Sequence, residues 1–189
     1  MDIRQIDGTQ FNEFMEVARG NVENVVLPTL INPSMQKALR DYVSPEKLAQ
    51  GMQTGSIALW GAYDSGRMVA VSAMETNGHI TMLYVTPYWQ KKKIAKALLE
   101  TMKTFARERL GLTRVTVNAM PATSATYFKK RGFAELEQQL APMDFVSLWS
   151  DTKPFTDYER KKVSTGQLLV CFLLPVVIAL LAVVIFVII

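Results

Sequence analysis

Hydrophobic positions change their spacing along the first 149 residues, alternating in some stretches and recurring every three or four residues in others. Alternation is typical of strands with one buried face, and the longer spacing is typical of amphipathic helices. The pattern predicts strands over 2–7, 57–63, 68–75, 80–86, 114–119 and 143–148. It predicts helices over 11–26, 35–42, 92–110 and 122–131, and a short helix that begins at Pro45.

Turn-forming residues separate these elements. Asn77-Gly78 and Asp64-Ser65-Gly66 are typical of hairpins, and Gly111 follows the end of a predicted helix. Ser34 is the expected N-cap of the helix over 35–42. The helix-to-strand crossover at Gly111 indicates that part of the sheet is parallel. We therefore expect an α/β (α+β) domain with a central mixed sheet flanked by helices.

A different pattern covers the last part of the sequence. Residues 165–189 form a long apolar run, and no charged residue follows Lys162. As a helix the run would extend about 37 Å, more than the roughly 30 Å of a bilayer's hydrocarbon core. Basic residues directly before the run place the preceding domain in the cytoplasm by the positive-inside rule. We expect a single-pass, tail-anchored membrane protein with a domain over 1–149, a juxtamembrane linker over 150–163 and a transmembrane helix over 164–189.

The amino-acid composition excludes several kinds of site. The chain has one cysteine, Cys171, and one histidine, His79, which excludes an internal disulfide and a zinc site built on cysteines. We expect no bound metal. The net charge of +4 is too small an excess to predict a nucleic-acid surface, so nucleic acid is not an expected partner.

The stretch from Leu83 to Leu99 predicts a strand, a turn with three consecutive lysines and a helix N-terminus. Free N–H groups and a partial positive charge make a helix N-terminus an anion site, and a solvated basic turn is the alternative. Gln90 and Ala95 fit the acetyl-CoA loop of the GNAT superfamily of N-acetyltransferases, a Gln/Arg-x-x-Gly-x-Gly/Ala element. The run from Tyr127 to Phe133 resembles a second element of that family, aromatic-Tyr-x-x-x-Gly-Phe. The resemblance covers about residues 1–149 and implies a GNAT-like fold.

The resemblance also implies where acetyl-CoA would bind as co-substrate. In the family, the pantetheine arm pairs with the fourth strand, and N–H groups of the following loop hold the pyrophosphate. Asn118 would hydrogen-bond the pantetheine, or alternatively cap the next helix. The implied cofactor-binding residues are Leu83, Tyr84, Val85, Gln90, Lys91, Lys92, Lys93, Ile94, Ala95, Lys96 and Asn118.

Two positions depart from the family pattern. Lys93 stands where the family usually has glycine, and Phe128 stands where it frequently has the tyrosine that protonates the departing thiolate. Tyr127 is then the candidate acid, with packing or cofactor contact as the alternative. Glu75 is a candidate base, with a solvated charge at a strand end as the alternative. His79 follows a hairpin turn and is expected to be an ordinary exposed histidine.

The prediction is a membrane-anchored N-acetyltransferase that transfers an acetyl group from acetyl-CoA to an amine of unassigned identity. The alternative is a GNAT-fold protein without catalysis that serves as a membrane-tethered binding or structural component of a larger assembly, for instance a viral one. Homo-oligomerisation is an expectation by fold analogy only.

Overall fold

The computed structural model describes residues 1–136 and 145–153. A mixed sheet runs through them in the strand order β1-β2-β3-β4-β5-β7-β6. Neighbouring strands are antiparallel, except that β5 runs parallel to β4. The strands are β1 (Asp2–Gln5), β2 (Ile57–Asp64), β3 (Arg67–Glu75), β4 (His79–Val85), β5 (Arg114–Ala119), β6 (Ala134–Glu135) and β7 (Val146–Asp151).

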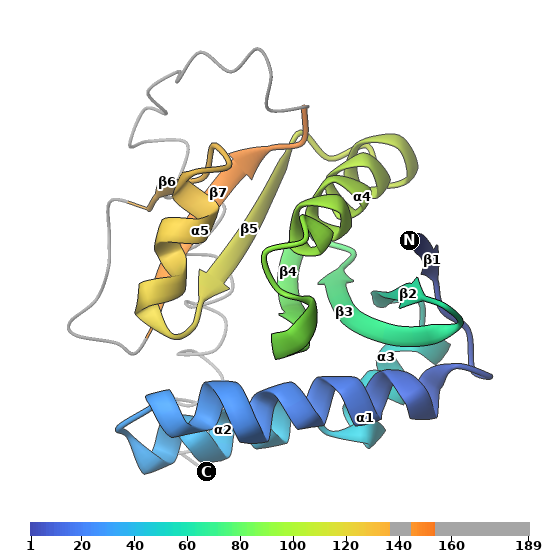
Figure 1. Ribbon diagram of the computed structural model, residues 1–189. Helices are drawn as coiled ribbons and strands as arrows, with labels where there is room; N and C mark the ends of the chain where they lie inside the picture. Colours follow the sequence, from blue (N-terminus) through green and yellow to red (C-terminus); the bar gives the residue numbers. More distant parts are fainter. Residues whose placement is uncertain (137–144, 154–189) are drawn as a thin grey trace, which may run out of the picture. The chain divides into compact units, whose positions relative to one another are not determined.

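Helices cover both faces of the sheet, with α1 and α2 on one side of β3 and β4 and with α4 on the other (Figure 1). The first group comprises α1 (Phe11–Asn21), the π-helical turn η1 (Val22–Val26), the 3-10 turn η2 (Leu27–Thr29), α2 (Pro33–Tyr42) and α3 (Pro45–Gln53). The second group comprises the turn η3 (Pro87–Trp89), α4 (Ile94–Arg109), the turn η4 (Ala122–Ser124) and α5 (Ala125–Lys129).

The core has two halves, one on each face of the sheet. One half packs Leu98 and Met102 of α4 against sheet residues such as Ala70. The other packs Phe14 and Ala18 of α1 against the opposite face. Apolar side chains at helical spacing on α1 and α4 therefore account for both layers.

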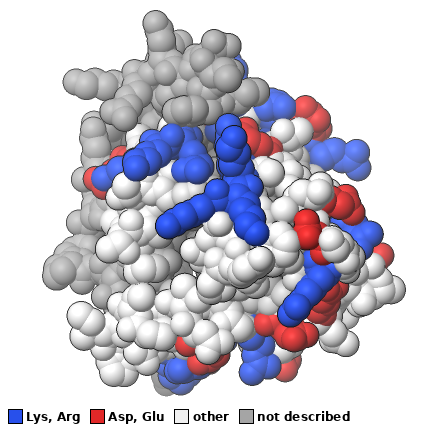
Figure 2. All heavy atoms as spheres, in the orientation of Figure 1, with Lys and Arg blue, Asp and Glu red and all other residues white. Residues whose placement is uncertain are grey.

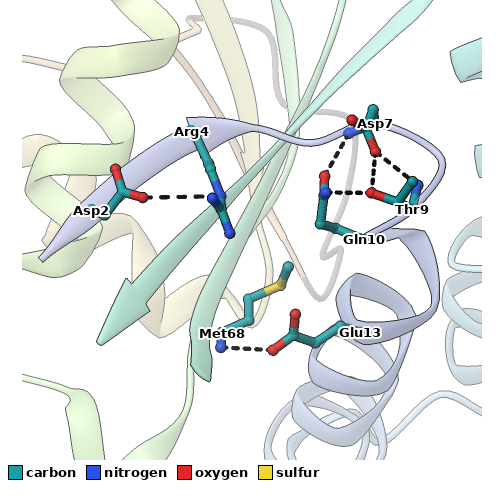
Figure 3. Close-up of polar contacts among 7 residues, drawn as sticks. All are labelled: Asp2, Arg4, Asp7, Thr9, Gln10, Glu13 and Met68. Atoms are coloured by element: carbon teal, nitrogen blue, oxygen red, sulfur yellow. Dashed lines mark hydrogen bonds and ion pairs between the residues drawn. The ribbon is translucent and has the colours of Figure 1, made fainter. Parts of the chain in front are cut away.

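A partly buried polar contact helps to hold α1 against the sheet. Glu13 Oε1 accepts a 2.8 Å hydrogen bond from the backbone N–H of Met68, the second residue of β3 (Figure 3). In the loop before α1, Asp7 Oδ1 accepts hydrogen bonds from the backbone and side chain of Thr9. These contacts fix the direction in which the chain enters α1.

The predicted elements are present with shifted ends. The helix expected over 11–26 becomes π-helical after Asn21, and the helix expected from residue 92 begins at Ile94. Ser34 is not an N-cap, because α2 begins at Pro33 and the side chain of Asn32 accepts a 2.9 Å hydrogen bond from the Ser34 N–H. Ser44 does cap α3, accepting from the Lys47 N–H.

The last strand lies three residues later than expected. β7 covers Val146–Asp151 because it pairs with the whole of β5, ending with Asp151 opposite Arg114. The next residue, Thr152, donates its backbone N–H to Thr113 O at 3.0 Å. The linker expected over 150–163 is therefore wrong at its start, since Ser150 and Asp151 belong to the sheet.

The transmembrane helix expected over 164–189 lies outside the described residues. Within 1–136 and 145–153, none of the helices combines the length and the apolar character that crossing a membrane requires.

Candidate active site

The parallel strands β4 and β5 separate after two paired positions. His79 lies opposite Thr116 and Ile80 opposite Val117, and the pairing ends there. At the next residue, Thr81, the register of β4 with β3 also shifts, because Ala73 pairs with Met82 and Met74 with Ile80. Thr81 is thus the extra residue of a β-bulge, which bends its strand. From Thr81 to Val85, β4 has no strand partner on its β5 side among the residues that the structure describes.

The loop after β4 is tightly braced. Thr86 Oγ1 donates to Val69 O at 3.0 Å, and the Trp89 N–H donates to Thr86 O at 2.8 Å. Gln90, the first residue of the expected acetyl-CoA loop, turns its side chain back and donates to Val85 O at 3.2 Å. Gln90 therefore positions the loop through the end of β4.

Two lysines in this loop have left-handed backbone conformations. The φ angles are 62° at Lys91 and 65° at Lys93, and Lys93 is the N-cap of α4. This conformation costs a residue with a side chain roughly 1–2 kcal/mol relative to the right-handed one. Lys93 thus replaces the family's glycine while keeping a backbone shape that glycine adopts freely.

The N-terminus of α4 has no capping side chain in the described part of the chain. Its helical hydrogen bonds begin with the Ala97 N–H, which donates to Lys93 O at 3.1 Å. The N–H groups of Ile94, Ala95 and Lys96 precede that bond and have no backbone partner among the described residues, as is typical of a helix N-terminus that could bind an anion. Figure 2 shows Lys and Arg side chains gathered on this face, near the start of α4 as drawn in Figure 1.

A cavity of about 860 Å³ extends from this helix N-terminus along the opened strand β4. It collects nearly all the residues implied by the resemblance, together with both candidate catalytic residues. The predicted residues that line it are Glu75, Leu83, Tyr84, Val85, Gln90, Lys91, Lys93, Ile94, Ala95, Lys96, Asn118 and Tyr127. Within the described ranges, no three His, Cys, Asp or Glu side chains gather as metal ligands would.

Lys92 is the one implied cofactor residue that does not line the cavity. Its ammonium group lies 4.4 Å from the ring centre of Tyr88 and 4.1 Å from that of Trp89. These cation–π contacts hold the side chain against the outside of the loop.

Among the described residues that line the cavity, Glu75 is the only one with a carboxylate. Its Oε1 accepts a 3.0 Å hydrogen bond from the hydroxyl of Tyr42, and its Oε2 accepts one of 3.0 Å from Asn77 Nδ2. Burial and the Glu75 charge raise the pKa of Tyr42, so Tyr42 remains the donor. The carboxylate is held by two neighbours, which a freely solvated strand-end charge would not be.

His79 lies in the cavity wall, so the expectation of an exposed histidine is wrong. It begins β4, and its Nδ1 lies 2.9 Å from Thr116 Oγ1 on β5. Burial lowers the pKa of His79, and the nearby Glu75 charge opposes this in part. The imidazole is therefore neutral at pH 7.

Tyr127 and Phe128 both line the cavity, but Phe128 also belongs to the core and contacts Phe133, with ring centres 5.3 Å apart. The Tyr127 hydroxyl is buried and has no hydrogen-bond partner among the described residues. Burial raises the pKa of Tyr127 to about 12, and Arg131 opposes the shift. The Arg131 guanidinium stacks 3.6 Å from the Tyr127 ring centre and donates to Tyr127 O at 2.9 Å.

Asn118 does not cap the following helix. Its Oδ1 accepts a 2.9 Å hydrogen bond from Ser147 Oγ on β7, and no side chain caps the turn η4. The sequence interpretation also missed Tyr42 and Arg131 as cavity residues. Tyr42 contacts Glu75 across 33 positions of the chain, and no motif includes it. Arg131 lies within the run from Tyr127 to Phe133, but at a position where the family element specifies no residue type.

Comparison with known proteins agrees with this geometry. The family model described as the acetyltransferase (GNAT) domain matches residues 22–143, more than half of the chain. No curated protein matches the sequence.

Solved structures show the same fold at low identity. PaiA N-acetyltransferase from Thermoplasma acidophilum, in complex with coenzyme A, is 18% identical with a TM-score of 0.65, over 79% of this chain and 98% of that one. A GCN5-related N-acetyltransferase from Rhodopseudomonas palustris is 18% identical with a TM-score of 0.64, over 79% and 94%. A predicted acetyltransferase with acetyl-CoA from Clostridium acetobutylicum is 18% identical with a TM-score of 0.59, over 75% and 95%. The family match over residues 22–143 agrees with the opened strand β4 and the uncapped N-terminus of α4, and the chain belongs to the GNAT acetyltransferase family.

Proposed function

We propose that this protein is an N-acetyltransferase that uses acetyl-CoA as co-substrate and an amine as acceptor. The observation that carries the proposal is the stretch of β4 from Thr81 to Val85, which pairs with β3 but not with β5 and lines a cavity that reaches the N-terminus of α4. Coenzyme A or acetyl-CoA is present in the solved structures from Thermoplasma acidophilum and Clostridium acetobutylicum, which supports the choice of co-substrate.

The proposed cofactor position follows from charge and backbone geometry. The pyrophosphate would bind the free N–H groups of Ile94, Ala95 and Lys96, where the helix dipole favours an anion. Lys91, Lys93 and Lys96 line the same end of the cavity and add positive charge. The amide groups of the pantetheine arm would pair with the free edge of β4 as an added strand does.

Glu75 and Tyr127 divide the proton transfers in this proposal. An acceptor that binds as an ammonium ion first loses one proton to water. The neutral amine nitrogen then attacks the thioester carbon, the new C–N bond forms and the C–S bond breaks. Glu75 takes the proton that the nitrogen loses, and the Tyr127 hydroxyl gives a proton to the departing thiolate. Because the pKa of Tyr127 is about 12, the hydroxyl carries its proton at neutral pH.

The transfer step is tested by release of free CoA thiol from the full chain supplied with acetyl-CoA and a panel of amines. We expect Glu75→Gln to lower kcat/KM about a hundredfold, the usual scale for loss of a general base. Glu46→Gln on the exposed surface of α3 makes the same chemical change away from the cavity and should leave the rate unchanged. Thiol release that is equal in Glu75→Gln and wild type would remove Glu75 from the mechanism.

We also propose that residues 164–189 anchor the domain to a membrane as a single span, with the domain on the cytoplasmic side. The support is the sequence: the run carries no charge and follows Arg160, Lys161 and Lys162. Membranes from cells that make the full chain should retain it through an alkaline wash. A chain that ends at Lys162 should not remain with the membranes after the same wash. Release of the full chain by the same wash would contradict the anchor.

A further inference from the structure

Helix α2 directs an apolar face into the cavity, and one residue of that face, Leu39, also packs against the core beside α1. Met35, Ala38, Leu39 and Tyr42 follow the spacing i, i+3, i+4, i+7, and all four line the cavity. None of the ten residues of α2 is fully buried. A surface helix normally buries such a face against its own domain. Here the apolar face remains available to a molecule in the cavity.

The wall near this face continues the apolar surface. The π-helical turn η1 contributes Val25 and Val26, and β4 contributes Met82. A π-helical turn inserts an extra residue per turn and is frequent at functional sites. These side chains and the α2 face line one part of the cavity.

Apart from Arg131, which stacks on the Tyr127 ring, the charged Lys and Glu side chains that line the cavity form two groups. Lys91, Lys93 and Lys96 stand at the start of α4, where the proposed pyrophosphate binds. Glu75 is bonded directly to Tyr42, the last residue of α2, and so adjoins the apolar face. A molecule on that face thus meets one carboxylate and otherwise mainly hydrocarbon.

We infer that the acceptor is a primary amine on an apolar carbon skeleton, an alkylamine or arylalkylamine. This inference rests on the proposed transferase function and names its substrate class. The ammonium group binds Glu75, and the skeleton packs against Met35, Ala38 and Leu39. A second cationic group along the skeleton would lie against apolar side chains without a partner, so polyamines are disfavoured.

The test compares two amines of equal length by calorimetry, using the full chain saturated with CoA. Hexylamine and 2-(2-aminoethoxy)ethanol carry the same ammonium group and the same number of heavy atoms, but the second replaces two carbons by oxygens. Hexylamine should bind about tenfold more tightly or better, because each buried methylene group favours binding. Equal affinities, or no binding of hexylamine, would overturn the inference.

A variant pair locates the binding surface. Ala38→Asp puts a charge on the apolar face at an exposed position, where folding should tolerate it. Its affinity for hexylamine should fall about tenfold, because an apolar chain would then lie against a hydrated carboxylate. Lys37→Gln makes the same change in net charge at an exposed neighbour whose ammonium pairs with Asp41 at 2.6 Å, and it should bind hexylamine as the wild type does. Wild-type affinity in Ala38→Asp would contradict the inference.

The binding readout separates this inference from the proposed function. Preferential binding of hexylamine without any acetyl transfer would refute the transferase function and still support the apolar amine site. Acetyl transfer that is faster for spermidine than for hexylamine would support the transferase function and overturn the inferred substrate class.

Discussion

At the scale of single residues, Lys93 departs from a motif and still has a backbone conformation that glycine adopts easily. The sequence indicates that the family's glycine is missing, and the structure shows Lys93 in the left-handed conformation, with φ at 65°. The lysine side chain lines the cavity at the start of α4. The substitution therefore adds a charge near the anion site and introduces a local conformational cost.

Replacement of Lys93 tests that cost. Alanine is usually more stable than glycine in ordinary backbone conformations, but at a left-handed position the order reverses. We expect Lys93→Gly to be about 1 kcal/mol more stable than Lys93→Ala in denaturant unfolding. Lys92 does not have a positive φ, so Lys92→Ala should be more stable than Lys92→Gly. The same order at both positions would contradict a strained Lys93.

Tyr127 tests the proposed acid. Tyr127→Phe removes only the hydroxyl and should lower kcat about a hundredfold while leaving the affinity for acetyl-CoA close to that of the wild type. Tyr88→Phe makes the same change on a side chain that is 79% exposed, and its kcat should not change. Equal kcat values for wild type and Tyr127→Phe would show that Tyr127 packs in the cavity wall but does not act as the acid.

His79 gives the domain a defined dependence on pH. Burial holds its folded pKa below the ordinary value of 6.5, so the unfolded chain binds more protons in the interval between the two values. The free energy of unfolding should therefore be highest above pH 6.5 and decrease as the pH falls through the folded pKa. As His79 is the only histidine, His79→Gln should flatten the curve between pH 5.5 and 7 in denaturant titrations. A curve of unchanged slope in His79→Gln would refute the buried neutral histidine.

At the scale of elements, hydrophobic spacing predicts most helices and strands, and the failures lie where tertiary contacts decide the ends. β7 extends to Asp151 because β5 offers a partner along its whole length. The bulge at Thr81 has no signature in an alternating strand, since it becomes visible only when the partner's register is known. The opening of β4 from β5 could therefore be expected from the family resemblance but not from the pattern itself.

The hairpin turn before β4 fixes the point where β4 and β5 meet. Gly78 has a φ angle of +88°, and its carbonyl accepts a 3.0 Å hydrogen bond from the N–H of Thr116 on β5. A Cβ added at Gly78 would lie 3.0 Å from Arg114 O, also on β5. Gly78→Ala should lower the free energy of unfolding by about 2 kcal/mol or more, from strain together with the collision.

Gly66 is the matched control for Gly78. It has φ at +80°, but an added Cβ meets nothing within 4 Å, so Gly66→Ala should cost only the strain, about 1 kcal/mol. Equal losses in the two variants, measured by thermal unfolding, would show that the contact with β5 does not constrain the turn.

At the scale of the whole molecule, the cavity joins residues that are far apart in the sequence. The end at the start of α4 could be predicted because Gln90 to Lys96 are consecutive, and Gln90 and Ala95 match a family element. The other end could not, since Tyr42 reaches Glu75 across 33 positions and neither residue stands in a motif. Arg131 was likewise unpredicted, because its position on the Tyr127 ring depends on how α5 packs.

The binding of acetyl-CoA to the full chain, measured by titration calorimetry, tests the account most directly. We predict one saturable site that CoA competes for, and an affinity about tenfold lower when Lys91, Lys93 and Lys96 are all replaced by glutamine. Lys92→Gln, whose side chain lies outside the cavity, should bind as the wild type does. No binding at millimolar acetyl-CoA, in protein whose circular dichroism shows it folded, would contradict the transferase account.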